Sequence, residues 1–305
     1  MEISVVFNQM GVLFILMALG FVLGKTKILT QDGNKILTKI VLFFALPATI
    51  LSSILHSTLD VTLGTILYTL GMSVITYALL VIISYPFIRL MGGNKANRGL
   101  YSASIMLGNS AFMGIPVVLA IFGVAGTFLA ALHNIMFNLL AFSFGIMMIS
   151  RKVSKFDPRM LLNPILLITV LLTPIAIFEI SFPPIVTQSI TTLGEMTTPA
   201  AMFIIGSTLA FIPLKSISAQ WRVIPITILK LVVVPVVVWF ILRLFITDEL
   251  LLGVLVVLSS MPTAVAVSMI SIEYDGDEQT ASAIVFLTTI LSAITVPAIV
   301  FFLLM

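Results

Sequence analysis

One stretch inside an apolar segment decides how this chain is interpreted: Gly108-Asn109-Ser110-Ala111-Phe112-Met113-Gly114-Ile115-Pro116. Proline lacks the backbone N–H of a helical hydrogen bond, and its ring clashes with the preceding turn. Glycine weakens a helix further. At mid-membrane depth, unpaired backbone survives only where it is buried in protein or lines a wet cavity. The stretch therefore predicts a broken helix inside a membrane.

A second stretch of the same kind is Ser259-Ser260-Met261-Pro262-Thr263. Broken helices at corresponding positions in two halves of a chain indicate the binding site of a transporter. The helices after the breaks are expected to begin near Pro116 and Pro262, and their N-termini carry partial positive charge and N–H groups. Such ends favour an anionic group, for example a carboxylate. The alternative is two structural kinks without a ligand.

The composition agrees with a membrane location. Hydrophobic residues make up 60% of the 305 and charged residues 9%, whereas a soluble domain has roughly 25% charged residues. The chain has no cysteine, which excludes disulfides and thiolate metal sites. Its net charge of +3 does not indicate a nucleic-acid partner. We expect no metal and no cofactor.

Long apolar runs predict an all-α membrane protein, because about 20 apolar residues cross the bilayer core. The runs are continuous rather than alternating, which excludes a transmembrane β-barrel. Ten spans are predicted, at 5–24, 36–55, 62–86, 99–122, 126–149, 160–179, 186–211, 222–244, 249–272 and 280–304.

The basic residues alternate from loop to loop, as the positive-inside rule requires. Both termini are therefore expected outside the cytoplasm of a cell whose inner or plasma membrane holds the protein. The loops expected in the cytoplasm carry Lys25, Lys27, Lys35 and Lys39, then Arg89, Lys95 and Arg98, then Arg151, Lys152, Lys155 and Arg159, then Lys215 and Arg222.

The chain divides into two sets of five spans, 1–150 and 160–305, joined by a cytoplasmic linker at 151–159. Because five is odd, related halves would form an inverted repeat. Prolines fall in corresponding spans, although prolines are also simply tolerated in membrane helices. The matched pairs are Pro47 with Pro199, Pro86 with Pro235, and Pro116 with Pro262.

Ionisable residues inside spans are functional candidates by default. Glu195 is expected about eight residues into its span, either as a buried carboxylate for a coupling H⁺ or Na⁺ or in a structural hydrogen bond. Lys230 either pairs with an anionic substrate or with Glu195, or extends its ammonium to the membrane surface.

Polar groups in the broken spans and in span 126–149 complete the expected binding site. Asn134 and Asn138 are four residues apart and share a helix face; they line the cavity or bond to neighbouring helices. The expected binding set is Asn109, Ser110, Gly114, Pro116, His133, Asn134, Asn138, Ser260, Pro262 and Thr263.

Several of these motifs resemble the auxin efflux carrier family. The first broken stretch, followed by Phe122-Gly123, looks like that family's fourth-helix motif. Further similar features are Pro262 with Glu273-Tyr274, Pro199-Ala200-Ala201-Met202-Phe203 before Gly206, and Lys230 five residues before Pro235. The likeness covers nearly the whole chain.

The resemblance implies ten helices as two inverted five-helix repeats. Spans 1, 2, 6 and 7 would form a scaffold that dimerises, and spans 3–5 and 8–10 a mobile transport domain. Carried over by motif, Asn109, Pro116 and Pro262 are the crossing positions, and His133 falls where plant members tend to have a polar residue facing the site. Plant members have a proline where this chain has Gly108 and often a long central loop that is absent here, so a small mono- or dicarboxylate is expected rather than an indole acid.

The sequence thus predicts a secondary carrier of a small organic anion that works by an elevator-type mechanism. A Na⁺-coupled symporter resembling bile-acid transporters is the alternative, with Glu195 as the natural ion ligand. An intramembrane enzyme or sensor is the third possibility, but no paired aspartates or Ser–His pair are seen at depth. We therefore expect no enzyme.

Overall fold

The computed structural model describes residues 3–56, 62–91, 95–141, 145–149, 171–172, 174–175, 178, 180, 182–212, 222–273 and 276–305. Within these ranges the chain is helical, without a strand. The predicted linker at 151–159 and most of the predicted span 160–179 lie outside them. Two compact units are formed. Unit 1 comprises Met1–Gly71, Ala111–Ile135 and Leu162–Phe211, and unit 2 comprises Met72–Ser110, Met136–Leu161 and Ile212–Met305.

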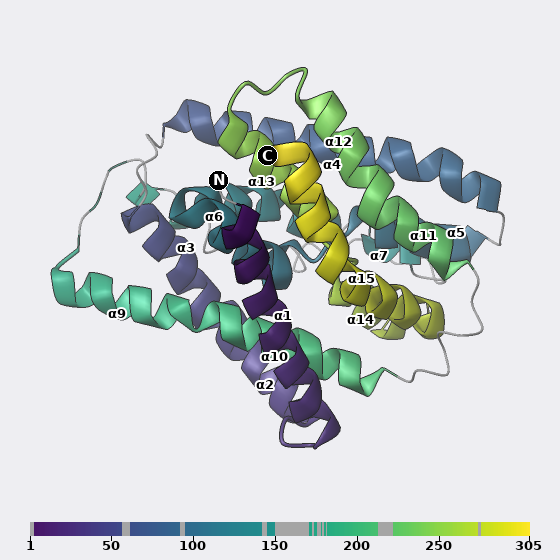
Figure 1. The fold of residues 1–305 in the computed structure, drawn as a ribbon, viewed down its shortest axis with the longest axis horizontal. Helices are drawn as coiled ribbons and strands as arrows, with labels where there is room; N and C mark the ends of the chain where they lie inside the picture. Colours follow the sequence, from purple (N-terminus) through teal and green to yellow (C-terminus); the bar gives the residue numbers. More distant parts are fainter. Residues whose placement is uncertain are drawn as a thin grey trace. The chain divides into compact units, whose positions relative to one another are not determined.

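Unit 1 is built mainly from the helices at the N-terminus and those before residue 212 (Figure 1). It also takes the start of α4 and most of α6, which both continue into unit 2. Its elements are α1 (Ile3–Lys25), α2 (Gln31–Ile40), the π-helix η1 (Val41–Ala45), α3 (Leu46–Leu55), α4 (Leu63–Met91), α6 (Ile115–Leu140), α9 (Pro184–Glu195) and α10 (Thr197–Phe211).

Unit 2 contains the C-terminal helices and the first part of the broken stretch. The π-helix η2 (Ser110–Gly114) begins in unit 2 and continues in unit 1. The remaining elements of unit 2 are α5 (Lys95–Met106), α7 (Ile146–Ile149), α11 (Val223–Ile228), the π-helix η6 (Leu229–Val233), α12 (Val234–Leu242), α13 (Glu249–Ser260), α14 (Val265–Glu273) and α15 (Glu278–Leu304).

Close glycine contacts hold α1 against α10 in unit 1. Gly20 and Gly24 follow the small-xxx-small spacing that allows membrane helices to approach closely. A Cβ at Gly20 would lie 2.6 Å from the Cα of Phe203, and one at Gly24 would lie 3.0 Å from the Cα of Ser207. Both contacts are with backbone atoms, so the two helices pack backbone to backbone.

Hydroxyl groups join α3 to the end of α9, also in unit 1. Thr49 Oγ1 lies 2.8 Å from the carbonyl oxygen of Gly194 and 2.7 Å from Thr197 Oγ1. These bonds satisfy a carbonyl at the end of α9. The helix ends there because Pro199 has no N–H for the carbonyl of Glu195 and its ring would clash with that carbonyl.

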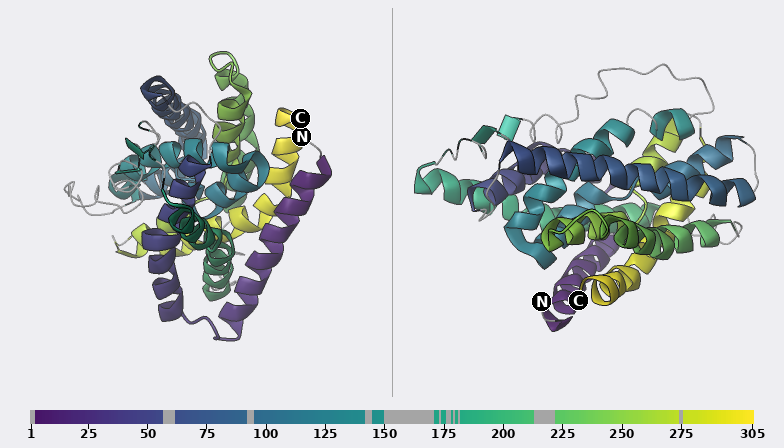
Figure 2. Two further views of the ribbon diagram at one scale, coloured as in Figure 1. Left: turned by 90° about the vertical axis from the view of Figure 1, so that its left-hand side faces the viewer. Right: turned by 90° about the horizontal axis from the view of Figure 1, so that it is seen from above.

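Three prolines, one of them in the predicted first break, are accommodated by π-helical turns. Pro47, Pro116 and Pro235 are each the second residue of the α-helix that follows a five-residue π segment. The carbonyl that such a proline leaves without a partner belongs to the residue four positions earlier, which is the middle of each π segment. Figure 2 shows the consequence for α11, η6 and α12, which run on as one helix.

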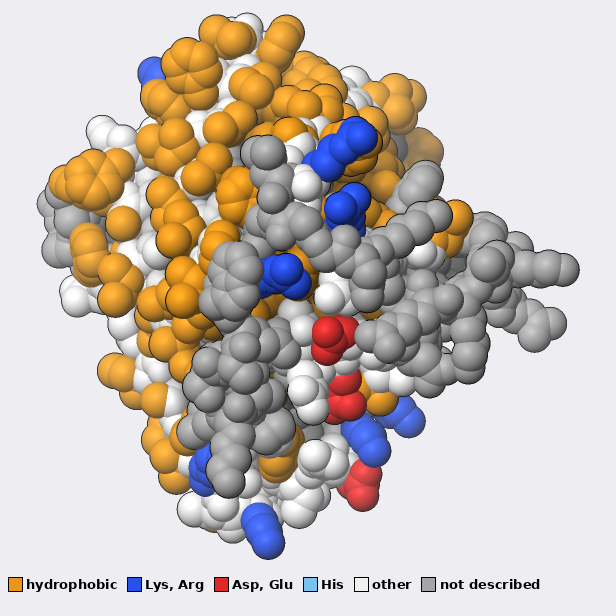
Figure 3. All heavy atoms as spheres, turned by 90° about the vertical axis from the view of Figure 1, so that its right-hand side faces the viewer, with side chains coloured by type: hydrophobic (Ala, Val, Ile, Leu, Met, Phe, Trp, Pro, Cys, Tyr) orange, Lys and Arg blue, Asp and Glu red, His pale blue; other side chains and the backbone are white. Residues whose placement is uncertain are grey.

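The membrane character is confirmed, whereas the ten-span count is only partly matched. Among the described residues, six segments are long and apolar enough to cross a bilayer, and α13 is a shorter apolar helix. On the face in Figure 3, hydrophobic side chains cover wide areas of the described surface. The six segments are Phe7–Lys25, Gln31–Leu55, Leu63–Arg89, Ser110–Leu140, Val223–Leu242 and Glu278–Leu304.

The segment Ser110–Leu140 is not one straight helix. Gly123 has φ 68° and ψ −160°, a non-helical conformation inside α6. Only glycine adopts a positive φ of this kind without strain. The sequence placed a short loop at this position, between the predicted spans 99–122 and 126–149, and the kink at Gly123 agrees with it.

Candidate functional site at the two helix interruptions

Unit 2 contains both helix interruptions. Helix α5 ends at Met106, and residues 107–109 are non-helical before η2 begins at Ser110. Helix α13 ends at Ser260, and residues 261–264 are non-helical before α14 begins at Val265. Both breaks were predicted. The α-helix after the first break, α6, begins at Ile115, next to Pro116 as expected, but the π turn η2 precedes it from Ser110.

The two interrupted segments pair with each other in antiparallel fashion. Gly108 and Thr263 form an isolated β-bridge. The N–H of Asn109 donates to the Pro262 carbonyl at 2.7 Å, and the N–H of Ala264 donates to the Leu107 carbonyl at 2.8 Å. Each break thus satisfies backbone groups of the other, which removes the cost of leaving them unpaired in an apolar interior.

Hydrogen bonds of Thr263 connect this pairing to α5 and α15 of unit 2. Its hydroxyl donates to the Ser104 carbonyl in the last turn of α5 at 2.8 Å. Its N–H donates to the Thr288 hydroxyl of α15 at 3.2 Å. Thr263 is fully buried, so its position is set by hydrogen bonds on both sides.

Asn109 lies at the first break with part of its side chain unpartnered. The residue is 4% exposed, and among the described residues its Nδ2 atom has no hydrogen-bond partner. A buried donor without an acceptor costs roughly 1–3 kcal/mol. Native proteins keep few such groups, and a bound ligand is one way to satisfy them. The Asn109 amide is therefore a hydrogen-bond donor available to a ligand.

Lys230 is fully buried in η6, so it does not extend its ammonium to the membrane surface. Its Nζ donates to the carbonyl of Ser259 at 3.3 Å, close to the end of α13. No carboxylate of the described residues lies within ion-pair distance of it. A cation near the C-terminus of a helix is favoured by the helix dipole.

The other predicted binding residues are all buried, but they are divided between the units. In unit 2, Ser110 shares a side-chain hydrogen bond with Tyr77, Ser260 donates to the Val257 carbonyl at 2.7 Å, and Asn138 is 3% exposed. In unit 1 lie Gly114, Pro116, His133 and Asn134; the Asn134 side chain donates to the Ala130 carbonyl at 3.0 Å.

Glu195 is not a buried carboxylate, which was one of the two alternatives that the sequence left open. It is exposed, at the last residue of α9 in unit 1. The helix is interrupted at Met196, and the neighbouring Gly194 is buried whereas Glu195 is exposed. Its part in ion coupling stays a prediction.

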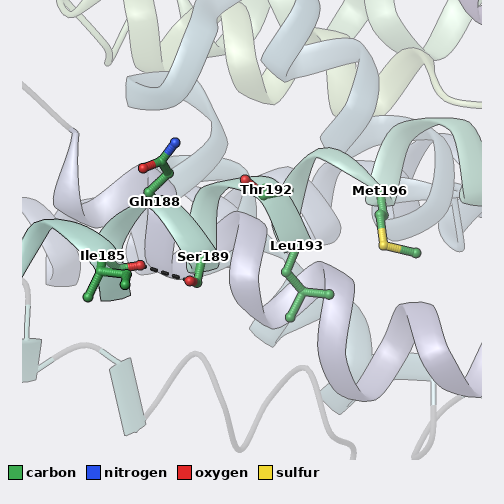
Figure 4. A pocket seen from close by; sticks show the side chains of 6 residues that line it. All are labelled: Ile185, Gln188, Ser189, Thr192, Leu193 and Met196. Atoms are coloured by element: carbon green, nitrogen blue, oxygen red, sulfur yellow. Dashed lines mark hydrogen bonds between the residues drawn. The ribbon is translucent and has the colours of Figure 1, made fainter.

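A hollow of about 510 Å³ lies along the same helix (Figure 4). All the residues that line it belong to α9 or directly follow it, and most of them are exposed. The Ser189 hydroxyl there donates to the carbonyl of Ile185 in its own helix at 2.8 Å. With one helix and no charged lining residue, this hollow does not have the convergent polar groups of a binding site.

Sequence reasoning missed Ser104 and Thr288 as partners of the breaks. Both lie in helices that carry other hydroxyl residues, and their side chains bond to the preceding turn of their own helix, at 2.8 Å and 2.7 Å respectively. Such residues are common in membrane helices. No local signal marks which of them face a helix break.

Comparison with known proteins identifies the family. The family described as membrane transport protein matches residues 5–165 and 159–300. An uncharacterized transporter of Methanothermobacter thermautotrophicus is 27% identical over 296 residues, covering 93% of both chains. One of Methanocaldococcus jannaschii is 28% identical over 305 residues, covering 93% of this chain and 94% of that one.

A further relative has a more specific name. A putative malonate transporter of Rhizobium meliloti is 36% identical over 122 residues, which is 39% of this chain and 37% of that protein. The family match spans nearly the whole chain. This chain belongs to the membrane transport protein family, the family of the auxin efflux carriers.

Proposed function

We propose that this protein is a secondary carrier that moves a small organic anion, such as a mono- or dicarboxylate, across the cell membrane. The observation that carries the proposal is the buried, unpartnered Nδ2 of Asn109 beside the paired helix breaks. An amide donor suits a carboxylate oxygen, and the N-terminus of α14, which begins directly after the second break, favours negative charge.

The relatives support the choice of substrate class. The putative malonate transporter matches only about two fifths of this chain, so its name favours a dicarboxylate without fixing the identity of the anion. Because Asn109 lies on a non-helical segment held by backbone bonds to the other break, the donor is fixed in place before the anion arrives.

The mechanism that we infer is an elevator-type movement in a homodimer. It rests on the inverted repeat of two five-span halves, with scaffold spans 1, 2, 6 and 7 and transport spans 3–5 and 8–10. The two units support this division in part. Unit 1 holds α1 to α3, α9 and α10, and unit 2 holds α11 to α15. Residues 111–135, expected in the transport domain, belong to unit 1.

The first experiment measures binding. Purified protein is heated in malonate, succinate, acetate or chloride, and a bound anion raises the unfolding temperature in proportion to its occupancy. Uptake of labelled malonate into vesicles containing the protein then measures transport. No stabilisation by any carboxylate, together with no flux, would contradict the proposal.

The second experiment tests the site. Asn109→Ala should weaken anion binding about tenfold, or about 1.4 kcal/mol, because it removes the donor. Its unfolding temperature without anion should stay near that of the wild type, since the amide has an unpartnered end. Asn34→Ala is the matched control. That amide bonds to Thr208 at 3.0 Å in unit 1, so its loss should lower stability and leave anion affinity unchanged. Normal anion affinity in Asn109→Ala would refute the site.

Two other functions predict results that distinguish them from the proposed carrier. A Na⁺-coupled symporter related to bile-acid carriers predicts that uptake ceases in Na⁺-free medium and that Glu195→Gln abolishes it. A sensor predicts anion binding without any transmembrane flux.

A further inference from the structure

A buried lysine lies at the end of the second broken helix, and no carboxylate of the described residues pairs with it. Lys230 is 0% exposed. Burying a charge requires compensation by paired charges or hydrogen bonds. Here the compensation that is visible is a backbone carbonyl, that of Ser259, at 3.3 Å from Nζ.

Two further carbonyl oxygens lie beside Gly108, next to Nζ. A Cβ placed on Gly108 would lie 3.2 Å from Lys230 Nζ, 3.4 Å from the Leu258 oxygen and 3.5 Å from the Met261 oxygen. The ammonium and these oxygens therefore converge on Gly108. The oxygens belong to the last turn of α13 and to the residue after it; the Leu258 carbonyl also accepts the Met261 N–H at 3.3 Å.

This arrangement has the chemistry of a cation site. In secondary transporters, unwound backbone carbonyls and the C-terminal ends of half-helices coordinate the coupling Na⁺ or H⁺. Hard cations such as Na⁺ prefer oxygen ligands, and the dipole of α13 adds negative potential at its C-terminal end. In this chain the group at that position is the ammonium of Lys230, which is part of the protein itself.

The π-helix η6 explains how a lysine reaches this position. Lys230 is the second residue of η6, and the π turn exists because Pro235 leaves the Leu231 carbonyl without its usual partner. The wider turn inserts an extra residue into the helix and changes which side chains face α13. The proline thus sets the direction of the lysine.

We propose that the Lys230 ammonium is a built-in cation that replaces a dissociable coupling ion at the C-terminal end of α13. The inference rests on the carrier function proposed above. It predicts that the protein needs no Na⁺ for either stability or transport. It also predicts that removing the ammonium creates an empty cation site that a small metal ion can fill.

The test measures unfolding temperature without any substrate, in NaCl, KCl or choline chloride at equal ionic strength. The wild type should melt at the same temperature in all three salts. Lys230→Ala should melt lower in choline chloride, by on the order of 5 °C, and Na⁺ should restore part of that loss in a saturable manner. Lys230→Met removes the charge and keeps the side-chain volume, so it should be destabilised in every salt. Lys25→Ala, at an exposed residue, is the control and should behave as the wild type.

Three results would overturn the proposal. The first is specific stabilisation of the wild type by Na⁺. The second is Lys230→Met as stable as the wild type, and the third is a destabilised Lys230→Ala that does not respond to any cation. If Lys230→Ala does not fold, the melting temperatures of the wild type in the three salts and the stability of Lys230→Met still test the proposal. Because these measurements use no substrate, a failure to find a transported anion would refute the carrier function and leave this result interpretable.

A transport assay extends the test once a substrate is identified. Uptake by the wild type should be equal in Na⁺ and choline media. Uptake by Lys230→Ala should be at least about tenfold higher in Na⁺ than in choline, because the ion then fills the vacated position. Equal uptake by the variant in both media would contradict the proposal.

Discussion

Gly108 and Lys230 share one small space, although 122 positions separate them in the sequence. The glycine has no side chain, and the ammonium takes the volume that a Cβ would need. From the sequence alone, Gly108 is a helix breaker and Lys230 is a lysine in an apolar span. Their contact depends on the pairing of the two breaks.

At this scale, Gly108→Ala should destabilise the protein by about 1–2 kcal/mol, because a methyl group 3.2 Å from Nζ overpacks a buried site. The free energy of unfolding is the measurement. Adding Lys230→Ala should make the alanine at 108 almost neutral, so the double-mutant cycle gives a coupling energy. Gly71→Ala, where no atom lies within 4 Å of the added methyl, is the control and should not destabilise. Additive losses would show that the two residues are independent.

Prolines show how a helix accommodates a residue that cannot donate its backbone hydrogen bond. The sequence rule that proline breaks a helix holds at Pro262, in the second interruption, and at Pro199, three residues into α10. It fails at Pro47, Pro116 and Pro235, where a π turn keeps the helix continuous. The difference lies in available partners. A full break is possible only where other groups bond to the backbone that leaves the helix. At the second break the Asn109 N–H does so, by donating to the Pro262 carbonyl.

The close packing of α1 against α10 in unit 1 can be tested with glycine substitutions. Gly20→Ala should cost roughly 2 kcal/mol, because the methyl would lie 2.6 Å from the Phe203 Cα and the backbones would have to separate. Gly11→Ala, in the same helix with nothing within 4 Å, should not destabilise. Unfolding temperatures of the two variants compare them directly. Equal stability would mean that α1 and α10 do not pack this closely in the membrane.

At the scale of the whole molecule, the alternation of basic loops predicts topology. Because the chain has no cysteine, single cysteines can be introduced without removing any native ones. A membrane-impermeant maleimide added to intact cells should label Thr62→Cys and Asp248→Cys. It should label Lys27→Cys only after the cells are opened. The reverse pattern would place both termini in the cytoplasm and invert the proposed orientation.

Much of the fold and part of the site were predictable from composition and local pattern. The apolar runs gave the membrane location, and the clusters of glycine and proline gave both breaks, at 108–116 and 259–263. The sequence placed the start of the next helix near Pro116, and α6 begins at Ile115, but the π turn from Ser110 was not predicted, since local propensity does not reveal that Ser110 follows a segment stabilised from outside. A buried Glu195 was one of two alternatives from the sequence, and it is not found, because an apolar neighbourhood in sequence does not show which side of a helix a residue occupies.

The sequence by itself determined that this chain is a helical membrane protein of a transporter family with two interrupted helices. These features follow from residue type and order, through hydrophobicity and the missing N–H of proline. Only the tertiary structure decided that Leu107 bonds to Ala264 and Asn109 to Pro262, that one end of the Asn109 amide stays unpartnered, and that Lys230 points at the end of α13. The physical reason is that hydrogen bonds are formed in space by groups that lie far apart in the chain, 29 residues for Lys230 and Ser259 and more than a hundred for the two breaks.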